Sequence, residues 1–221
     1  TYFADRDSSA MRREAAELLR TIIETVPEER LVRRRDVSWK GFDAEYIRDE
    51  TASTYGTQAS RLLYAIQNLR EGCPAPEITG EDDTGRTFEL SEYRDKDVLL
   101  MFSYPSCGAC RPWYPVNRDL VEHFEGKPFA VLGVWASVGT GDTLEGLQKS
   151  IEEGEVTWRR WWDGRDGPIA TTWDVQFWPT IYLIDARGTI RRRFPQRDLE
   201  WLKTIIAGLI SEIDEHAVAD P

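Results

Sequence analysis

The stretch that decides the fold is YPSCGACRPW at residues 104–113, which follows the apolar run VLLMF at residues 98–102. Two cysteines separated by two residues, placed where a buried strand gives way to a helix, are the arrangement that dithiol–disulfide chemistry requires. If Cys107 lies in the first turn of that helix, unpaired backbone N–H groups and the helix dipole stabilise its thiolate. We therefore predict that Cys107 is the attacking thiol.

Cys110 lies three residues further along the predicted helix, on the face that carries Cys107. From there it can attack a mixed disulfide between Cys107 and a partner, which releases the partner as a thiol. The two residues between the cysteines, Gly108 and Ala109, are small and leave both sulfur atoms uncovered. The spacing thus predicts a reversible disulfide between Cys107 and Cys110.

Two other interpretations of the CxxC spacing remain open. The same spacing supplies half of many zinc sites, but zinc normally takes four ligands, and the other candidates are Cys73, His123 and His216. Two cysteines can also fill a core as small hydrophobic residues. The strand before the motif and the segments after it favour redox chemistry, for which we expect no metal and no cofactor.

Length and composition exclude several classes of protein. The chain has 221 residues, of which 41% are hydrophobic and 30% charged, and it can bury a substantial core. A net charge of −11 argues against nucleic-acid binding, and no apolar run approaches the length of a membrane span. Three cysteines suit a redox pair and one spare thiol, which fits a cytoplasmic or an extracytoplasmic location. We favour the latter, in the periplasm or cell envelope.

Residues 1–72 are predicted to form a helical appendage without a catalytic motif. Apolar residues recur with helical spacing from Met11 to Ile23 and again from Thr57 to Leu69. Each apolar stripe needs a partner surface, which leaves open a homodimer through these helices. The segment GCPAP at residues 72–76 cannot continue a helix, so we predict domains at 1–72 and 73–221.

Strand and helix patterns alternate after this boundary. A hairpin is predicted from Ile78 to Leu90, with a turn at residues 82–85. Strands are then expected at 98–102, 129–135, 156–162, 180–185 and 189–194, and helices at 143–153, 168–173 and 198–213. The helix after the CxxC motif should run to Phe124 and be kinked by Pro115. This alternation predicts an α/β fold with a mixed sheet flanked by helices.

The order of these segments resembles the thioredoxin superfamily and, more narrowly, the TlpA-like and redoxin-type thiol-disulfide oxidoreductases. The resemblance rests on PAP, the hairpin, the buried strand, CGAC, a following proline, and WPT before a strand that ends in DARG. It covers about residues 74–215 and implies that residues 129–163 are an inserted strand and helix. It further implies that Cys107 and Cys110 are the redox pair.

The same resemblance implies that Pro179 is the family's cis-proline and forms the floor of a peptide-binding groove. Trp178, next to Pro179, is the candidate for a wall of this groove, and Gly108 and Ala109 are also expected to bind substrate. Met101 departs from the pattern, since thioredoxins carry a buried aspartate six residues before the first cysteine. We therefore expect no carboxylate near Cys107, and helix N-terminal N–H groups that Gly108 and Ala109 leave free to stabilise its thiolate. Both effects predict a pair more oxidising than that of thioredoxin.

These features predict a thiol-disulfide oxidoreductase that acts on protein or small-molecule disulfides and takes electrons from a thiol donor. A peroxide-reducing redoxin is one alternative, although Tyr104 occupies the position three residues before Cys107 where peroxiredoxins carry Thr or Ser. The other is a non-catalytic module that uses a thioredoxin-like fold to present residues 1–72 to a partner.

Overall fold

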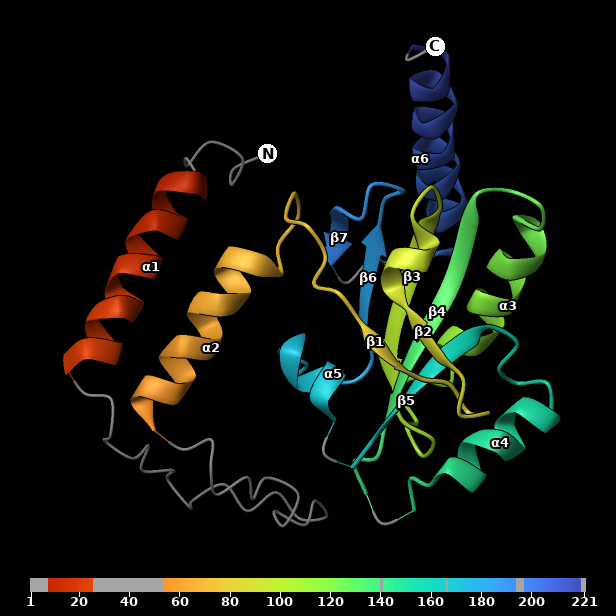
Figure 1. Ribbon diagram of the computed structural model, residues 1–221, viewed down its shortest axis with the longest axis horizontal. Helices are drawn as coiled ribbons and strands as arrows, with labels where there is room; N and C mark the ends of the chain where they lie inside the picture. The colour runs from red at the N-terminus through yellow and green to blue at the C-terminus, as the bar shows by residue number, and fades with distance from the viewer. Residues whose placement is uncertain (1–7, 26–53, 140, 166, 194–196, 220–221) are drawn as a thin grey trace. The chain divides into compact units, whose positions relative to one another are not determined.

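The structure is a computed structural model that describes residues 8–25, 54–139, 141–165, 167–193 and 197–219, with side chains up to residue 213 (Figure 1). The chain divides into two compact units, residues 1–67 and residues 68–221. The division lies a few residues ahead of the boundary predicted at the GCPAP segment.

The first unit contains two described helices, α1 (Ser8–Thr25) and α2 (Tyr55–Asn68), where the apolar spacing predicted them. The N-terminus of α2 is capped, because the Thr57 N–H donates to the Thr54 hydroxyl at 3.1 Å. Each helix buries an alanine, Ala16 or Ala59. Within the described part of the chain, no helix is both long and apolar enough to cross a membrane.

A five-stranded mixed sheet forms the centre of the second unit, in the order β5-β4-β3-β6-β7. The β3–β4 and β4–β5 pairs are parallel, whereas β3–β6 and β6–β7 are antiparallel. Every residue of the central strand β3 is buried, as expected for a strand covered on both faces. The strands are β3 (Asp97–Ser103), β4 (Phe129–Ala136), β5 (Arg159–Gly164), β6 (Thr180–Ile184) and β7 (Ile190–Arg193). The predicted mixed α/β sheet is confirmed.

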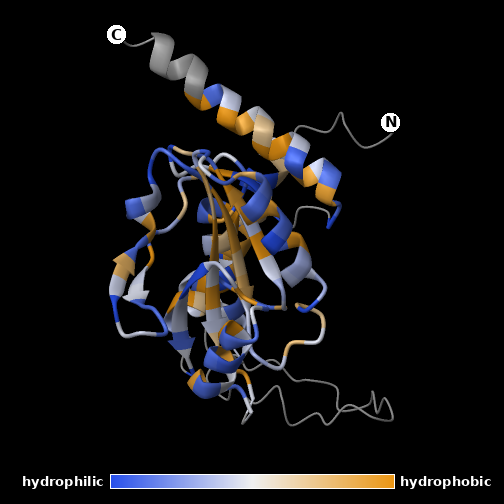
Figure 2. Cartoon of the chain, turned by 90° about the vertical axis from the view of Figure 1, so that its right-hand side faces the viewer, coloured by the Kyte–Doolittle hydropathy of each residue, from blue (hydrophilic) through white to orange (hydrophobic). Residues whose placement is uncertain are grey.

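Helices pack on the apolar strands, whose hydrophobic colouring stands out in Figure 2. On one face, Leu99 and Met101 join a core cluster with residues of three helices: Leu120 of α3 (Trp113–His123), Leu147 of α4 (Leu144–Glu152), and Leu202 and Ile206 of α6 (Leu199–Ala219). On the other face, the ring of Phe102 lies 5.5 Å from that of Trp173, which directly follows α5 (Pro168–Thr172). Alternation along β3 thus supplies both halves of the core.

The predicted hairpin is present as β1 (Thr79–Glu81) and β2 (Thr87–Glu89), followed by the short 3₁₀ helix η2 (Leu90–Tyr93). The ring of Phe88 stacks on Trp161 of β5 with centroids 4.1 Å apart, and the Trp161 indole N–H donates to the Phe88 carbonyl at 3.1 Å. A Cβ on Gly80 would lie 3.1 Å from the Trp161 ring, so a glycine at this position permits the close approach.

The segment from Gly72 to Ala75 runs beside β7. The Gly72 N–H donates to the Ile190 carbonyl, and the Ile190 N–H donates to the Cys73 carbonyl, both at 2.8 Å. These bonds cover an edge of the sheet that would otherwise expose unpaired backbone groups. Cys73 is buried there.

Strand β5 was predicted to begin at Val156, but it begins three residues later, at Arg159. The N–H groups of Glu155 and Val156 donate to the Ser150 carbonyl at 2.9 and 3.3 Å, and so close the C-terminal end of α4. The first residue of β5 paired with β4 is Arg159, opposite Leu132. The apolar pattern alone did not separate the residues that end the helix from those that begin the strand.

Candidate active site

The CxxC motif lies just beyond the carboxyl end of β3. The chain turns after Ser103, and the Cys107 N–H closes the turn by donating to the Tyr104 carbonyl at 3.0 Å. Open α/β sheets usually hold their reactive groups at this end of their strands. The buried strand predicted from VLLMF therefore places the motif at this end of the sheet.

Cys107 and Cys110 form a disulfide, with their Cα atoms 5.2 Å apart. Both cysteines are almost completely buried, whereas Gly108 and Ala109 between them are exposed. A Cβ on Gly108 would meet no atom within 4 Å, so there is open space beside the motif. The Cys110 N–H donates to the Cys107 sulfur at 3.1 Å. A backbone donor thus faces the sulfur that is predicted to attack.

The regular helix α3 begins at Trp113, so the expectation that Cys107 lies in its first turn is wrong. Turns connect the two: the Arg111 N–H donates to the Cys107 carbonyl at 3.3 Å, and the Trp113 N–H donates to the Cys110 carbonyl at 2.9 Å. Pro112 and Pro115 have no N–H with which to continue a helical ladder from Cys107. Stabilisation of the sulfur is therefore local, through the Cys110 N–H, and does not come from a helix terminus at Cys107.

Pro115 is the third residue of α3. The first-turn N–H groups of a helix have no intrahelical partner, so a proline there removes no hydrogen bond. Pro115 therefore does not lie in the middle of a long helix, where a kink was predicted. The chain changes from turns to regular helix two residues before it, at Trp113.

Trp178 and Pro179 immediately precede β6, and the bond between them is cis. Thr180 pairs with Phe102, so these two residues lie beside the strand end from which the CxxC motif begins. The Trp178 ring makes an edge contact with Tyr104 at a centroid distance of 5.6 Å, and it packs against the core cluster that contains both cysteines. The sheet therefore brings Trp178 to the redox motif across 71 positions of sequence from Cys107.

Asp142 is a residue of this region that sequence reasoning missed. It lies between β4 and α4, is 3% exposed, and accepts the Ser106 N–H at 2.9 Å. Ser106 is bonded to Cys107, so the expectation of no carboxylate near Cys107 is wrong. The expected oxidising character loses one of the premises on which it rested. Asp142 appears in the sequence only as part of the loop GTGDT, which carries no signal for a partner 36 residues away.

Residues 72–193, more than half of the chain, match the AhpC/TSA family. The chain belongs to this family. The match begins at the segment that covers β7 and ends with β7 itself, and it includes the redox pair, Asp142 and Pro179.

Named relatives and solved structures agree with this assignment to the AhpC/TSA family. The thiol-disulfide oxidoreductase ResA of Bacillus subtilis is 25% identical over 124 residues, which are 56% of this chain and 66% of ResA. ResA of Geobacillus thermodenitrificans is 26% identical over 121 residues, 55% of this chain and 67% of that protein. This chain therefore matches about two thirds of the length of these relatives.

Two structures illustrate the shared thioredoxin-like fold. The thioredoxin domain of a thiol-disulfide oxidoreductase from Bacteroides vulgatus matches with a TM-score of 0.54 and 25% identity, over 63% of this chain and 99% of that one. A thiol:disulfide interchange protein from Bacteroides sp. matches with a TM-score of 0.54 and 26% identity, over 61% and 88% of the two chains. The predicted fold is confirmed.

Met101, which stands in place of the thioredoxin aspartate, lies beside buried polar groups. The Asn117 amide donates to the Met101 sulfur at 3.3 Å. Within the described residues, the Asn117 carbonyl oxygen and the hydroxyls of Ser103 and Tyr114 have no hydrogen-bond partner at normal geometry. Burial raises the pKa of Tyr114, an effect that the neighbouring Ser103 hydroxyl opposes. These neutral groups occupy the side of the sheet on which the cysteines pack.

The described residues contain no group of three His, Cys, Asp or Glu side chains arranged to hold a metal ion. His123, one candidate zinc ligand, is the last residue of α3, and its ring lies against Phe124 at a centroid distance of 4.7 Å. Cys73 lies beside β7. Neither is brought to the redox pair by the contacts described here.

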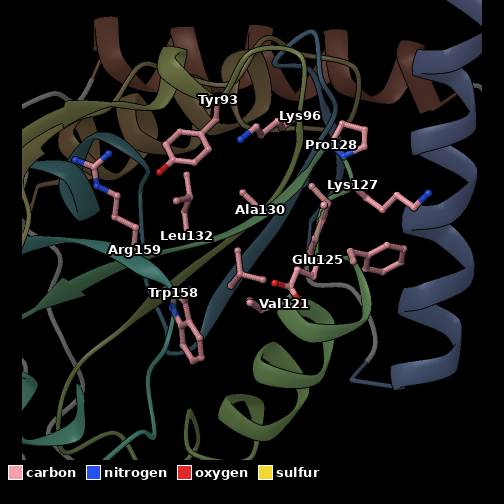
Figure 3. A pocket seen from close by; sticks show the side chains of 14 residues that line it. Tyr93, Lys96, Val121, Glu125, Lys127, Pro128, Ala130, Leu132, Trp158 and Arg159 are labelled. Carbon is pink, nitrogen blue, oxygen red and sulfur yellow. The ribbon is translucent and has the colours of Figure 1, made fainter. Parts of the chain in front are cut away.

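A groove of about 690 Å³ lies at the opposite end of the sheet, where β4 and β5 begin (Figure 3). Apolar residues line it, among them Val121, Leu132 and Trp158, and Lys96 and Lys127 are among its polar lining residues. None of the six site residues predicted from the sequence lines it. This groove and the Cys107–Cys110 pair are therefore separate features.

Proposed function

We propose that this protein is a thiol-disulfide oxidoreductase that cycles Cys107 and Cys110 between dithiol and disulfide. The observation that carries the proposal is their disulfide, which lies beyond the carboxyl end of β3 with exposed small residues between its two cysteines. The names of the relatives support the same reaction class.

In the reductive direction, the Cys107 thiolate attacks one sulfur of a substrate disulfide. A new bond forms between Cys107 and that sulfur, the substrate disulfide breaks, and the second substrate sulfur leaves as a thiolate. The Cys110 N–H, 3.1 Å from the Cys107 sulfur in the disulfide, is a donor that can stabilise the charge before attack.

Cys110 completes the cycle. Its thiol gives up a proton, and its sulfur attacks Cys107, which restores the Cys107–Cys110 disulfide and releases the substrate as a thiolate. Two electrons pass from the dithiol to the substrate. A thiol donor reduces the pair again by the same exchange in reverse.

The substrates we propose are protein disulfides presented in extended segments. Trp178 and Pro179 would form one side of the binding groove, and Gly108 and Ala109 the other. Trp178 contacts Tyr104 and packs against the core cluster that contains both cysteines, and Phe177, the residue before it, is exposed, so this segment offers apolar surface to a substrate. Extended segments with an apolar residue beside their cysteine would gain contacts there that a small disulfide lacks.

We further propose that residues 1–72 supply no catalytic group. The Tyr104 and Trp178 rings, which contact each other, and the core cluster that contains both cysteines belong to the larger unit. The chemistry is therefore expected to reside in residues 73–221, with residues 68–72 needed for the cover of β7.

The proposal is tested by asymmetric trapping. Cys110→Ser in the full chain should accumulate mixed disulfides with a protein disulfide substrate, whereas Cys107→Ser should not. Equal trapping by both variants would overturn the assigned roles. Turnover of hydrogen peroxide at a rate comparable to disulfide reduction would favour a peroxidase. A folded, unmodified chain that neither reduces nor forms disulfides would favour a binding module.

A further inference from the structure

Asp142 joins two segments at the redox pair. Its Oδ1 accepts the N–H of Ser106 at 2.9 Å, and its Oδ2 accepts the N–H groups of Val138 and Gly139 at 3.1 and 2.7 Å. One buried carboxylate therefore ties the loop after β4 to the residue that precedes Cys107. All three partners are N–H donors, so both carboxylate oxygens act as acceptors.

We propose that Asp142 is a positioning and charge-setting residue: its negative charge opposes the Cys107 thiolate and thereby lowers the reduction potential of the Cys107–Cys110 pair. The proposal rests on the proposed function only in taking Cys107 as the ionising thiol. A carboxylate that is 3% exposed is poorly screened by water, and Asp142 accepts the N–H of Ser106, the residue bonded to Cys107, so its charge reaches the Cys107 sulfur.

Other charged groups near the motif differ from Asp142 in exposure and pairing. Arg111, next to Cys110, is exposed and forms an ion pair with Glu155 at 3.2 Å, which reduces its effect on the sulfurs. Glu145 lies on the first turn of α4, where a Cβ on Gly146 would come 3.7 Å from Pro105, but Glu145 is solvent-exposed. Tyr114 of α3 is neutral at physiological pH, because burial raises its pKa.

The effect of Asp142 on potential follows from the equilibrium. Reduction of the disulfide creates a thiolate at Cys107, and a nearby negative charge raises the free energy of that form. A less stable reduced form means a lower potential. Replacing Asp142 by a neutral residue should therefore make the pair a stronger oxidant.

The first test is the pH dependence of Cys107 alkylation by iodoacetamide in a full-length Cys110→Ser background. Asp142→Asn should lower the midpoint pH of this profile by about half a unit to one unit. Asp142→Glu keeps the charge and should move the midpoint by less than half as much. A residue with a merely structural role would shift both variants alike, or neither.

Asp163→Asn is the matched control. Asp163 is also a buried carboxylate, and it accepts the N–H groups of Ile169 and Ala170, both at 2.8 Å, at the start of α5. Its loss should destabilise the fold without moving the alkylation midpoint. An equal midpoint shift in Asp163→Asn would overturn the proposal.

The second test is equilibration of the two cysteines with glutathione buffers in the otherwise unmodified chain. Asp142→Asn should raise the equilibrium constant for reduction of the Cys107–Cys110 disulfide about three- to tenfold. A tenfold change corresponds to about 30 mV in reduction potential. An unchanged equilibrium constant for reduction of the pair by glutathione, in a variant whose circular dichroism matches that of the parent protein, would overturn the proposal. Because neither test uses turnover, an inactive enzyme with shifted alkylation would reject the proposed function and keep this inference.

If Asp142→Asn does not fold, the proposal can be tested by an NMR titration of the unmodified protein. The ¹³C resonance of the Asp142 carboxyl in the reduced protein should show an inflection at the alkylation midpoint of Cys107, because coupling between two charges is reciprocal. The oxidised protein should lack this inflection. Identical titration curves in the two redox states would overturn the proposal.

Discussion

Two buried carboxylates lie at opposite ends of the central strand, and they differ in the donors they receive. Asp97, the first residue of β3, accepts the Ala186 N–H at 3.0 Å through Oδ1, while its Oδ2 has no hydrogen-bond partner among the described residues. Asp142, at the end where β3 leads into the CxxC motif, accepts three N–H groups and uses both oxygens.

The consequence is visible in the ionisation of Asp97. Burial raises its pKa to about 7, and the negative charges of Asp185 and Glu212 add to the effect, while the Ala186 N–H and Arg191 oppose it. Asp185, Glu212 and Arg191 also line a cavity of about 330 Å³ next to Asp97. The comparison shows that two buried carboxylates can differ in how many N–H donors reach them, and that at Asp97 a single donor does not offset the cost of burial.

The largest expected effect is a loss of turnover that occurs only when the residue changed lies at the CxxC end of β3. Cys107→Ser should reduce disulfide reductase turnover by about 10³-fold or more, because it removes the nucleophile. Asp97→Asn, at the other end, should leave turnover within about twofold. A reductase assay on full-length variants at pH 7 measures both, and a large loss of turnover in folded Asp97→Asn would break the separation.

The next effect concerns stability and pH. Asp97 binds its proton more tightly when folded, so the stability it contributes is fully present below about pH 4 and is lost as pH rises through about 7. At roughly 1.4 kcal/mol per pH unit, the upper limit of this loss is about 4 kcal/mol. Urea unfolding from pH 4 to 8 should show the decline, and Asp97→Asn should flatten it. A parallel slope in the variant would assign the decline to other groups.

A smaller effect is expected on substrate binding at the cysteine end of β3. Trp178→Ala should raise KM for a protein disulfide about five- to tenfold, the equivalent of 1 to 1.4 kcal/mol, and change the rate with a small aromatic disulfide little. Trp201→Ala is the control, because Trp201 of α6 packs partly buried against the same core cluster but lies outside the proposed groove. Equal KM changes in both variants would indicate a general packing defect.

The smallest effect on chemistry should come from removing the first unit. A fragment of residues 68–221 should retain turnover of a small disulfide within about twofold of the full chain. A fragment that starts at residue 76 lacks the three hydrogen bonds between residues 72–75 and residues 188–190, which should lower its unfolding free energy by roughly 1–3 kcal/mol. Loss of turnover in a folded 68–221 fragment would place part of the site in residues 1–67.

The sequence alone determined the α/β fold, the two helices of the first unit, the hairpin and the pairing of Cys107 with Cys110. These are local patterns: apolar spacing distinguishes strand from helix, and both cysteines lie within four consecutive residues. Pro179 was assigned a place near the cysteines through the family resemblance, and Trp178 was assigned to the same groove. The sheet register places them beside the strand end that leads into the motif.

Other features depended on tertiary structure. The start of α3 at Trp113 and of β5 at Arg159 follow from hydrogen bonds that close turns and helix ends, which periodicity does not encode. Asp142 and Asp97 are two aspartates among many in an acidic chain, and nothing in their neighbours along the sequence marks them. Their partners, Ser106 and Ala186, lie 36 and 89 residues away, and only the folded sheet brings each carboxylate to the backbone N–H groups that donate to it.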